Sequence, residues 1–500
     1  MKRVLRQLAG ATLRYHHPCR YRSSFARSSA PFVQSRESYE EVDGPEMITS
    51  IPGPRSKALI DDLNPIQESR TVHFFADYAS SNGSYVMDVD GNRLLDLNCQ
   101  IASLPLGYNH PAIVAALRNP NNTHLLANRP ALGYCPPREF VAMLEDSLLA
   151  VAPFKMKQVM TTMCGSCSNE NAFKTSFMHY MQQMRGSGSP TDEEIQTCVQ
   201  NKTPGSCKLS ILAFSGGFHG RSSLGALTAS SSKVAFKLDL PAFDWPLAPF
   251  PQLQYPLEDH IRENREEENR CLAAVEEILD SQLKANCPVA AICVEPIQAE
   301  GGDNYASPAF FKELQRLGKA YRALLIVDEV QTGCGATGHM WAHESWQLDE
   351  PPDMVTFSKK MQTGGVYVRN GLRPKQPGRL GCTWMGDPAK LLMAVEIIDV
   401  ILRDRLVDLV RVSGGELLGG LKELENSYSI LSAARGMGTY CAVDLPTTEI
   451  RDDVIKALHN RGVYVIGSGV RSIRLRPALT LTPRHVGVFL DILDGVLADF

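Results

Sequence analysis

The sequence lacks several features that would assign it to a particular class of protein. No apolar run approaches roughly 18 residues, the length of a membrane-spanning helix, so we expect no membrane partner. The formal net charge is only −4, which argues against a nucleic-acid partner. The chain also has no internal repeat, and its 500 residues are too many for one simple core. We therefore expect two or more domains.

Acidic residues are absent from the first 36 positions, which hold eight Lys or Arg before the first acid, Glu37. At helical spacing, Val4, Leu5 and Leu8 share one side, opposite most of the basic residues. An Arg-rich, Ser-rich, acid-free amphipathic segment is typical of a mitochondrial transit peptide. A disordered basic tail or a surface helix is the alternative. We expect residues 1–36 to be a transit peptide and the protein to act in the mitochondrial matrix.

Cysteine is not scarce, but its pattern gives no disulfide framework. The 13 cysteines are scattered, mostly within apolar segments, and no secretory signal is present. Most of them are expected to be small core residues. Cys164 and Cys167 form a CxxC pair, which on its own fits either half of a zinc site or a redox disulfide.

Four short apolar runs, each bounded by polar or turn residues and mostly separated by helix-length sequence, predict an α/β fold. They are KLSILAF (208–214), VAAICVEPI (289–297), ALLIVDEV (323–330) and DMVTFSK (353–359). Strands that alternate with helices indicate a mostly parallel sheet covered on both faces. Ligands of such sheets bind beyond the carboxyl ends of the strands. Each run is followed by polar residues, so we expect the functional residues to gather along one edge.

Three further segments have a clear local pattern. Residues 258–279 predict a long helix with a charged, solvated face. Residues 185–196 are interpreted as a surface loop or insertion. Residues 158–181 predict a strand, a tight turn and a helix, whose N-terminal amide groups would attract a phosphate.

Two of the strand ends carry a motif of known chemistry. Asp328 ends one apolar strand, and Lys360 follows the next, four positions before the Gly364–Gly365 pair. Together with EPIQAEGG (295–302) and SIRLRPALT (472–480), this arrangement resembles the class III pyridoxal-phosphate aminotransferases. The resemblance runs from about residue 45 to the end. The CGSC and FDWP motifs narrow it to the branch that acts on 4-aminobutyrate in animal mitochondria.

The resemblance implies a fold type I pyridoxal-phosphate transferase, with a mostly parallel sheet flanked by helices and a smaller α+β domain. Residues 37–115 would form an N-terminal segment that packs with the small domain. Residues 116–385 would form the large cofactor-binding domain, and residues 386–500 the small domain.

Transamination removes a proton from a carbon next to an amine, and the pyridoxal ring delocalises the resulting charge best when its nitrogen is protonated. By resemblance, Asp328 is the carboxylate that favours the charged nitrogen, and Gln331 binds the ring oxygen. Adjacent residues of an extended chain point to opposite sides, so Lys359 and Lys360 should not both face the ring. The spacing of the family selects Lys360 as the lysine that holds the cofactor and moves the proton. Lys359 is then expected to be an outward or supporting charge.

The resemblance also assigns the residues around the cofactor. Gly165 and Ser166 match the phosphate-binding pair, although an ordinary Ser-capped helix is the alternative. Phe218 matches the ring that stacks on the cofactor, and His219 lies beside it in the same FHGR motif. Thr383 matches a threonine that reaches the phosphate of the neighbouring subunit, which implies a homodimer.

Two arginines are expected to select the small-molecule substrates. Arg221 matches the residue that binds the far carboxylate of 4-aminobutyrate, and Ile101 and Lys233 match residues that line the pocket. Arg474 matches the arginine that binds the additional carboxylate of 2-oxoglutarate. Glu300 would neutralise Arg474 while 4-aminobutyrate is bound; a purely structural salt bridge is the alternative.

The resemblance further implies an iron–sulfur cluster at the subunit interface, in which Cys164 and Cys167 from both subunits would supply four thiolates to a [2Fe–2S] centre. Redox-active or plain cysteines are the alternatives.

The implied reaction converts 4-aminobutyrate and 2-oxoglutarate to succinate semialdehyde and glutamate, with β-alanine and 3-aminoisobutyrate as further candidate amines. A lysine or ornithine aminotransferase of the same class is the nearest alternative. A vestigial iron–sulfur or redox binding protein is a more distant one, because the cofactor motif is intact.

Overall fold

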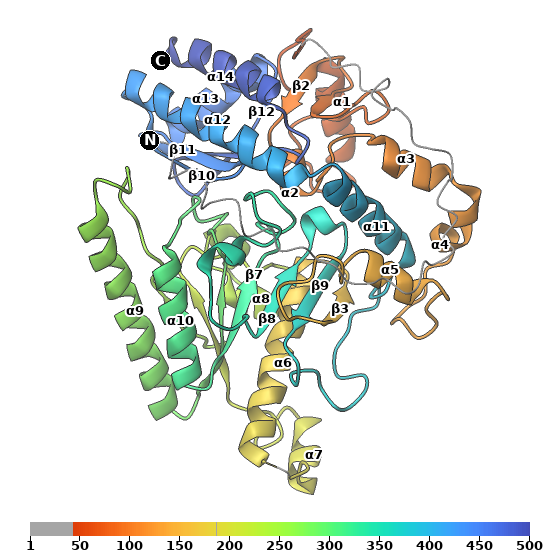
Figure 1. The fold of residues 1–500 in the computed structure, drawn as a ribbon, viewed down its shortest axis with the longest axis vertical. Helices are drawn as coiled ribbons and strands as arrows, with labels where there is room; N and C mark the ends of the chain where they lie inside the picture. The colour runs from red at the N-terminus through yellow and green to blue at the C-terminus, as the bar shows by residue number, and fades with distance from the viewer. Residues whose placement is uncertain (1–43, 187) are drawn as a thin grey trace, which may run out of the picture. The chain divides into compact units, whose positions relative to one another are not determined.

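A computed structural model describes residues 44–186 and 188–500 (Figure 1). The expected transit peptide, residues 1–36, lies outside the described residues. The largest element is a seven-stranded sheet of order β3-β9-β8-β7-β6-β4-β5. Its strands are β3 (Gln158–Thr162), β4 (Ser210–Phe214), β5 (Leu247–Ala248), β6 (Val289–Val294), β7 (Leu324–Asp328), β8 (Met354–Phe357) and β9 (Gly364–Val368).

The four apolar runs of the sequence form the centre of this sheet. β4, β6, β7 and β8 pair in parallel, and within this sheet β9 alone runs in the opposite direction; the edge strand β3 pairs antiparallel with β9 and so runs in the same direction as β8. All residues of these four strands are buried, as expected for a parallel sheet with both faces covered. The expectation of a mostly parallel sheet flanked by helices is therefore confirmed.

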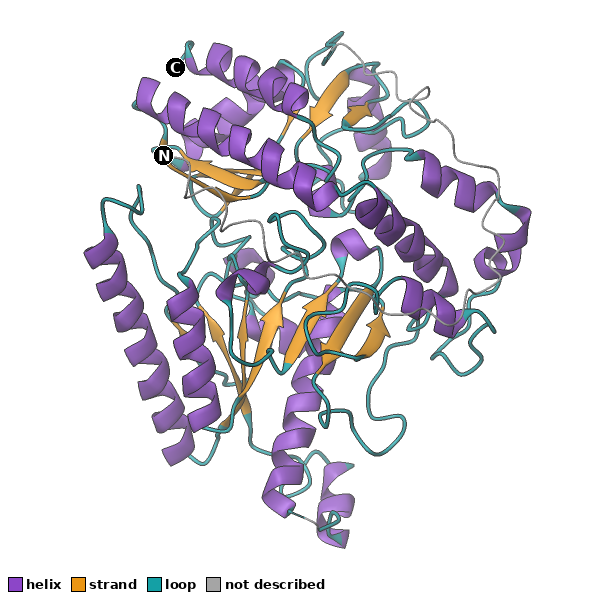
Figure 2. Ribbon diagram, in the orientation of Figure 1, coloured by secondary structure: helices purple, strands orange, loops and turns teal. Residues whose placement is uncertain are grey.

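The two faces of the sheet are covered by different helices (Figure 2). On one face, Phe173 of α6 (Gly165–Arg185) packs with Ala291 and Cys293 of β6. On the other face, α10 (Pro308–Ala320) approaches Ile292, the residue between them. Side chains alternate along a strand, so apolar residues at every position of β6 are what two covered faces require.

A second, antiparallel sheet of order β10-β11-β14-β13 is formed by the C-terminal part of the chain. Its strands are β10 (Ser432–Met437), β11 (Tyr440–Asp444), β13 (Ile466–Ser468) and β14 (Ser472–Leu475). The helices α12 (Leu406–Ser427) and α14 (Pro483–Leu497) contribute to its apolar core (Figure 1).

A three-stranded sheet joins the N-terminal segment to the C-terminal one. It comprises β1 (Tyr85–Met87), β2 (Arg93–Asp96) and β12 (Val463–Tyr464), and Leu95 pairs with Val463. The pairing brings residues of 37–115 next to residues of 386–500. The domain boundaries at 115/116 and 385/386 stay predictions.

The remaining helices range from four-residue turns to the 24-residue α9. The other α-helices are α1 (Pro54–Leu63), α2 (Cys99–Ala102), α3 (Pro111–Arg118), α4 (Thr123–Ala127), α5 (Phe140–Asp146), α7 (Asp192–Cys198), α8 (Leu224–Ala229), α9 (Ile261–Lys284), α11 (Pro388–Arg403) and α13 (Thr448–Asn460). The 3-10 turns are η1 (Pro120–Asn122), η2 (Val234–Phe236), η3 (Ala342–Trp346) and η4 (Lys359–Met361). Among the described residues, no helix combines the length and apolar content that crossing a membrane requires.

Two local predictions had different outcomes. The long charged helix expected at 258–279 is confirmed as α9. The loop expected at 185–196 was wrong in part, because α7 begins at Asp192. There, the Thr191 side chain accepts from the Glu194 backbone N–H and the Glu194 carboxylate accepts from the Thr191 N–H, a capping box that starts a helix despite the nearby Gly and Pro residues.

Candidate active site

The carboxyl ends of the parallel strands carry the residues that the sequence singled out. Asp328 is the last residue of β7, and Lys360 lies in η4, directly after β8. Phe218 and His219 follow β4, and Glu300 follows β6. Because parallel strands present these ends at one edge, residues far apart in sequence come together there.

The Asp328 carboxylate is buried, with 4% of the residue exposed, and is held by several donors. Its Oδ2 accepts from Asn169 Nδ2 at 2.7 Å and lies 2.8 Å from His219 Nδ1, and its Oδ1 accepts from the Val330 backbone N–H at 3.0 Å. Burial acts to lower the pKa of His219, but the Cys293 sulfur and the Asp328 carboxylate raise it well above the ordinary histidine value. These contacts fix one carboxylate orientation at the end of β7.

Lys360 is a buried amine, 2% exposed, whose Nζ donates to the Gln331 carbonyl at 3.3 Å. Burial, together with the nearby Arg476 guanidinium, lowers the pKa of Lys360 to about 8. A lysine with a depressed pKa is a better nucleophile and proton carrier near neutral pH. Lys360 therefore has the environment that its predicted role requires.

The premise that the chain is extended at Lys359 and Lys360 was wrong. The chain leaves β8 through Ser358 and enters the 3-10 turn η4, where Lys359 has a positive φ of 31° and Gln362 one of 55°. From this turn, Lys359 Nζ donates to the Ile101 carbonyl and Lys360 Nζ to the Gln331 carbonyl. That only Lys360 faces the ring stays a prediction. Burial and the charge of Arg474 lower the pKa of Lys359 to about 7.

Gly165 and Ser166 open the 21-residue helix α6. A Cβ at Gly165 would come 2.8 Å from Val330 Cγ1, so only glycine fits against this valine. Ser166 Oγ accepts from the Arg221 backbone N–H at 3.3 Å. The N-terminal amides of α6 and the FHGR segment thus border one site. Val330, which lies against Gly165, is two residues after Asp328 in the chain.

The aromatic and basic residues after β4 surround Phe236 of η2. The ring of Phe218 lies 5.8 Å from that of Phe236, and the Arg221 guanidinium lies 5.0 Å from the Phe236 centroid. Arg221 is exposed and makes no ion pair within the described chain. Its charge is therefore available to an anionic ligand.

Glu300 and Arg474 form a buried ion pair, with 2.6 Å between Oε1 and NH1. Lys233 Nζ lies 3.4 Å from the other oxygen of Glu300. Although burial acts to raise it, the charges of Arg474, Lys233 and Lys359 lower the pKa of Glu300 to about 2. Arg474 Nε is buried and has no hydrogen-bond partner in the described chain, so its N–H group can donate to a ligand.

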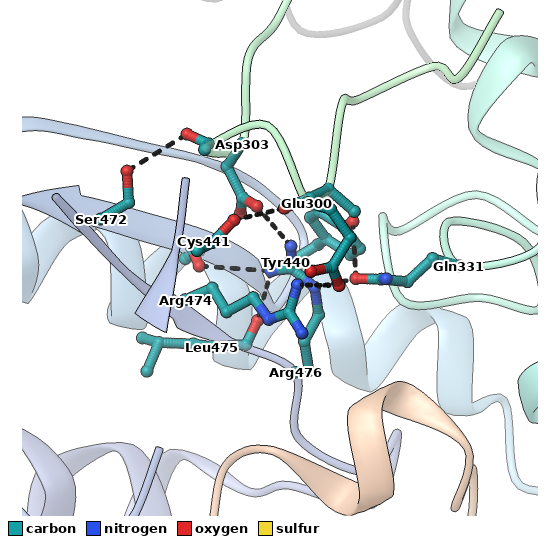
Figure 3. A network of polar contacts seen from close by, with 12 residues as sticks. Glu300, Asp303, Gln331, Tyr440, Cys441, Ser472, Arg474, Leu475 and Arg476 are labelled. Carbon is teal, nitrogen blue, oxygen red and sulfur yellow. Dashed lines mark hydrogen bonds and ion pairs between the residues drawn. The ribbon is translucent and has the colours of Figure 1, made fainter. Parts of the chain in front are cut away.

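A buried polar network lies next to this pair and was missed by the sequence reasoning (Figure 3). Arg476 donates through NH2 to Asp303 at 2.6 Å and through Nε to Gln331 Oε1 at 2.8 Å, and its guanidinium lies 3.2 Å from the Tyr440 centroid. Tyr440 OH donates to the same Gln331 oxygen at 3.0 Å. The network fixes Gln331, whose carbonyl in turn accepts from Lys360.

The other predicted site residues lie at the margins. Ile101 is partly exposed, and its carbonyl accepts from Lys359 Nζ at 3.2 Å. Thr383 is exposed and follows Cys382, whose sulfur accepts from the Met163 N–H. The Cys164 and Cys167 sulfurs lie 3.7 Å apart at the start of α6. The roles predicted for these four site residues, in the pocket, the partner site and the cluster, stay predictions.

The comparison with known proteins decides the family. The family model "Aminotransferase class-III" matches residues 66–497. The chain is a class III aminotransferase. It is 49% identical over 461 residues to the mitochondrial 4-aminobutyrate aminotransferases of Sus scrofa and Homo sapiens, covering 92% of this chain and 92% of each relative. A 4-aminobutyrate aminotransferase of Dictyostelium discoideum is 48% identical over 477 residues, 95% of this chain and 96% of the relative.

Solved structures resemble this class III aminotransferase as well. The lysine aminotransferase from M. tuberculosis has a TM-score of 0.78 and 27% identity, and the match covers 89% of this chain and 99% of that one. A transaminase from the marine bacterium Virgibacillus, at 20% identity and a TM-score of 0.74, supports the fold alone. The fold type I architecture expected from the sequence is confirmed.

The family implies pyridoxal phosphate, and the described residues fit it. Lys360 supplies a buried amine of lowered pKa, Asp328 a fixed carboxylate, and the start of α6 a set of amide donors beside Gly165 and Ser166. These are the three groups that an aldehyde, a pyridine nitrogen and a phosphate require. Asn169, which orients Asp328, was missed as an individual residue although it lies two residues after the CGSC motif.

Proposed function

We propose that this aminotransferase transfers the amino group of 4-aminobutyrate to 2-oxoglutarate, giving succinate semialdehyde and glutamate. The observation that carries the proposal is the different state of its two arginines: Arg221 is exposed without an ion pair in the described chain, whereas Arg474 is paired with Glu300. An ω-amino acid with one carboxylate needs one available cation, and a dicarboxylate keto acid needs a second. The 49% identity to 4-aminobutyrate aminotransferases supports the same substrates.

In this proposal, separate residues move the proton, hold the cofactor and bind the substrate carboxylate. The pyridoxal ring, when bound, delocalises the electron pair that remains after proton removal. Lys360 Nζ carries that proton, Asp328 keeps the ring nitrogen protonated, and the amides at Gly165 and Ser166 bind the phosphate. Arg221 binds the far carboxylate of either substrate, with Phe218 and His219 beside the ring. Lys360, buried beside the Gln331 carbonyl, is shielded from bulk water.

We further infer a homodimer with a [2Fe–2S] cluster held by Cys164 and Cys167 and by the same two cysteines of a second copy. Two sulfurs on one tetrahedral metal ion with bonds of about 2.3 Å lie roughly 3.8 Å apart. The observed 3.7 Å supports such a pair. Within the described residues of one chain there is no group of three or more metal ligands, so in this proposal the other two thiolates come from a second copy. Thr383, on the exposed loop after Cys382, would then reach the partner's phosphate.

We infer a mitochondrial matrix location, with residues 1–36 removed after import. The mitochondrial names of several relatives support this location. Mass spectrometry of the protein purified from mitochondria tests it: a mature N-terminus between about residues 22 and 40 is expected. An intact Met1 in the matrix would contradict the inference.

The substrate proposal is tested by a product assay with matched amines. We expect glutamate formation from 4-aminobutyrate and 2-oxoglutarate, and weaker or no turnover with lysine and ornithine. The structural likeness to a lysine aminotransferase makes lysine the necessary competitor. A preference for lysine or ornithine would contradict the proposal, and no transamination with any amine would favour a vestigial enzyme.

Arg221→Ala sharpens this assay. Leaving the substrate carboxylate without its cation costs about 3–5 kcal/mol, so kcat/KM for 4-aminobutyrate should fall by about 10²- to 10⁴-fold, mainly through KM. Arg316→Ala, which removes an exposed arginine from a surface ion pair, is the matched control. Unchanged kinetics in Arg221→Ala would exclude this role.

A further inference from the structure

Three cationic side chains converge on the single carboxylate of Glu300. Arg474 and Lys233 contact it directly, at 2.6 Å and 3.4 Å, and Lys359 lies near enough for its charge to act on Glu300. With all four groups ionised, the cluster carries two positive charges in excess. Arg474 and Glu300 are buried, whereas Lys233 and Lys359 are partly exposed, and an excess of positive charge at such a site attracts a further anion. One added carboxylate would lower it to a single charge.

The position of Lys359 depends on strained backbone on both sides. The turn α2 has four consecutive residues with positive φ, 44° at Cys99, 54° at Gln100, 57° at Ile101 and 61° at Ala102. Left-handed helical residues other than glycine cost roughly 1–2 kcal/mol each, and such strain is found where function requires it. This turn presents the Ile101 carbonyl to Lys359 Nζ.

A second contact joins the same two segments. Gln362 Nε2 donates to the Ser103 carbonyl, one residue after α2. The turn around Lys359 is therefore held at both ends against the left-handed turn. An ammonium group has three N–H donors, and Lys359 uses one on Ile101. Within the described chain, the other two remain available to an anion beside Glu300 and Arg474.

We propose that Lys359 is a specificity-determining residue that binds the additional carboxylate of the dicarboxylate keto acid together with Arg474. Lys233 stays paired with Glu300 while this carboxylate is bound. The inference rests on the proposed function and names the second cation for the keto acid. Arg474 contributes its unpartnered Nε, and Lys359 its remaining donors. Glu300 keeps an ionic partner throughout, so it need not be protonated or expelled. A monocarboxylate substrate makes no use of Lys359.

The test measures binding of two unreactive ligands of equal length, glutarate with two carboxylates and valerate with one. Ligand-dependent thermal stabilisation of the holoenzyme gives each dissociation constant without turnover. In Lys359→Gln, glutarate affinity should fall by about 10- to 100-fold, as expected for a lost charged hydrogen bond, and valerate affinity by less than about 2-fold. Lys319→Gln, a surface lysine paired with Glu350, is the control and should change neither. Lys359→Arg should recover most of the glutarate affinity.

Equal losses for both ligands, or no loss of glutarate affinity, would overturn the proposal. If Lys359→Gln does not fold, judged by circular dichroism, Lys359→Met keeps the aliphatic stem, removes only the charge and carries the same expectation. The proposed function fails separately, if the unaltered enzyme forms no glutamate from 4-aminobutyrate and 2-oxoglutarate. The ratio of glutarate to valerate binding still reports on Lys359 in that case.

Discussion

The two ends of the active site are built in opposite ways. At the Asp328 end, the charged group is buried, accepts hydrogen bonds from Asn169 and Val330, and faces His219. Its supports come from the seven-stranded sheet and the helix α6 that covers it. A group held from several directions keeps one orientation, which suits the constant task of binding a ring nitrogen.

At the Glu300 end, the charged groups come from four separate segments and both large sheets. Arg474 lies in β14 of the C-terminal sheet, whereas Glu300, Lys233 and Lys359 follow β6, precede η2 and follow β8. This end has surplus positive charge, strained turns and an unpartnered buried donor. The difference suggests that one end performs the same step in both half-reactions, while the other distinguishes their substrates.

Of the substitutions considered, replacing Lys360 should cause the largest loss of activity. Lys360→Ala removes the amine that we propose holds the cofactor and moves the proton, so both half-reactions should slow by about 10⁴-fold or more, because covalent and general-base functions are lost together. Lys359→Ala should keep the half-reaction with 4-aminobutyrate. Single-turnover absorbance changes measure each half-reaction separately. The reverse pattern, with Lys359 essential and Lys360 dispensable, would contradict the assignment.

Asp328→Asn should have the next largest effect. The amide keeps the shape but carries no charge, so the ring nitrogen loses the partner that keeps it protonated. Both half-reactions should slow by about 10²- to 10³-fold, the usual cost of losing one preorganised electrostatic contact. Asp349→Asn, on the exposed surface, serves as the control. A loss restricted to one half-reaction would show that the Asp328 end also distinguishes substrates.

The placement of the residues at the Asp328 end could be predicted from the sequence, because they follow strands that can be recognised locally. Asp328 and Lys360 stand directly after apolar runs, and a parallel sheet brings such positions to one edge. Arg476 and its partners Asp303 and Tyr440 were not predicted, because their contacts join the two sheets. One signal was available: Arg474 and Arg476 are two residues apart around the end of β14, and alternate residues of a strand share a face.

The backbone conformation at Lys359 was mispredicted for a different reason. The argument assumed an extended chain after β8, whereas the backbone turns at once into η4 with positive φ at Lys359. Lysine and glutamine are not among the residue types that predict a left-handed backbone conformation. The turn is set by contacts with α2, which lies more than 250 residues earlier in the chain.

The pH dependence of dicarboxylate binding is expected to show the smallest effect, and it tests the Glu300 end of the site. Burial and Arg474 lower the pKa of Lys359 to about 7, so its ammonium is present below pH 7 and is lost as the pH rises through this value. Glu300 has a pKa of about 2 and stays ionised throughout, and Arg474 and Arg476 stay charged. Glutarate itself is ionised above about pH 6. Its affinity should therefore fall between about pH 6 and 8.5, approaching that of Lys359→Gln.

Lys359→Arg separates this titration from that of neighbouring groups. A guanidinium does not lose its proton in this range, so the affinity of the arginine variant for glutarate should stay nearly constant while that of the unaltered enzyme declines. Lys360, with a pKa of about 8, is common to both proteins, so any change that it causes appears in both profiles. Valerate binding should follow the same course in the two proteins, because it has no carboxylate to place beside Lys359. A parallel decline of glutarate affinity in both would assign the titration to another group, and the surplus charge at this end would then come from Lys233 and Arg474 alone.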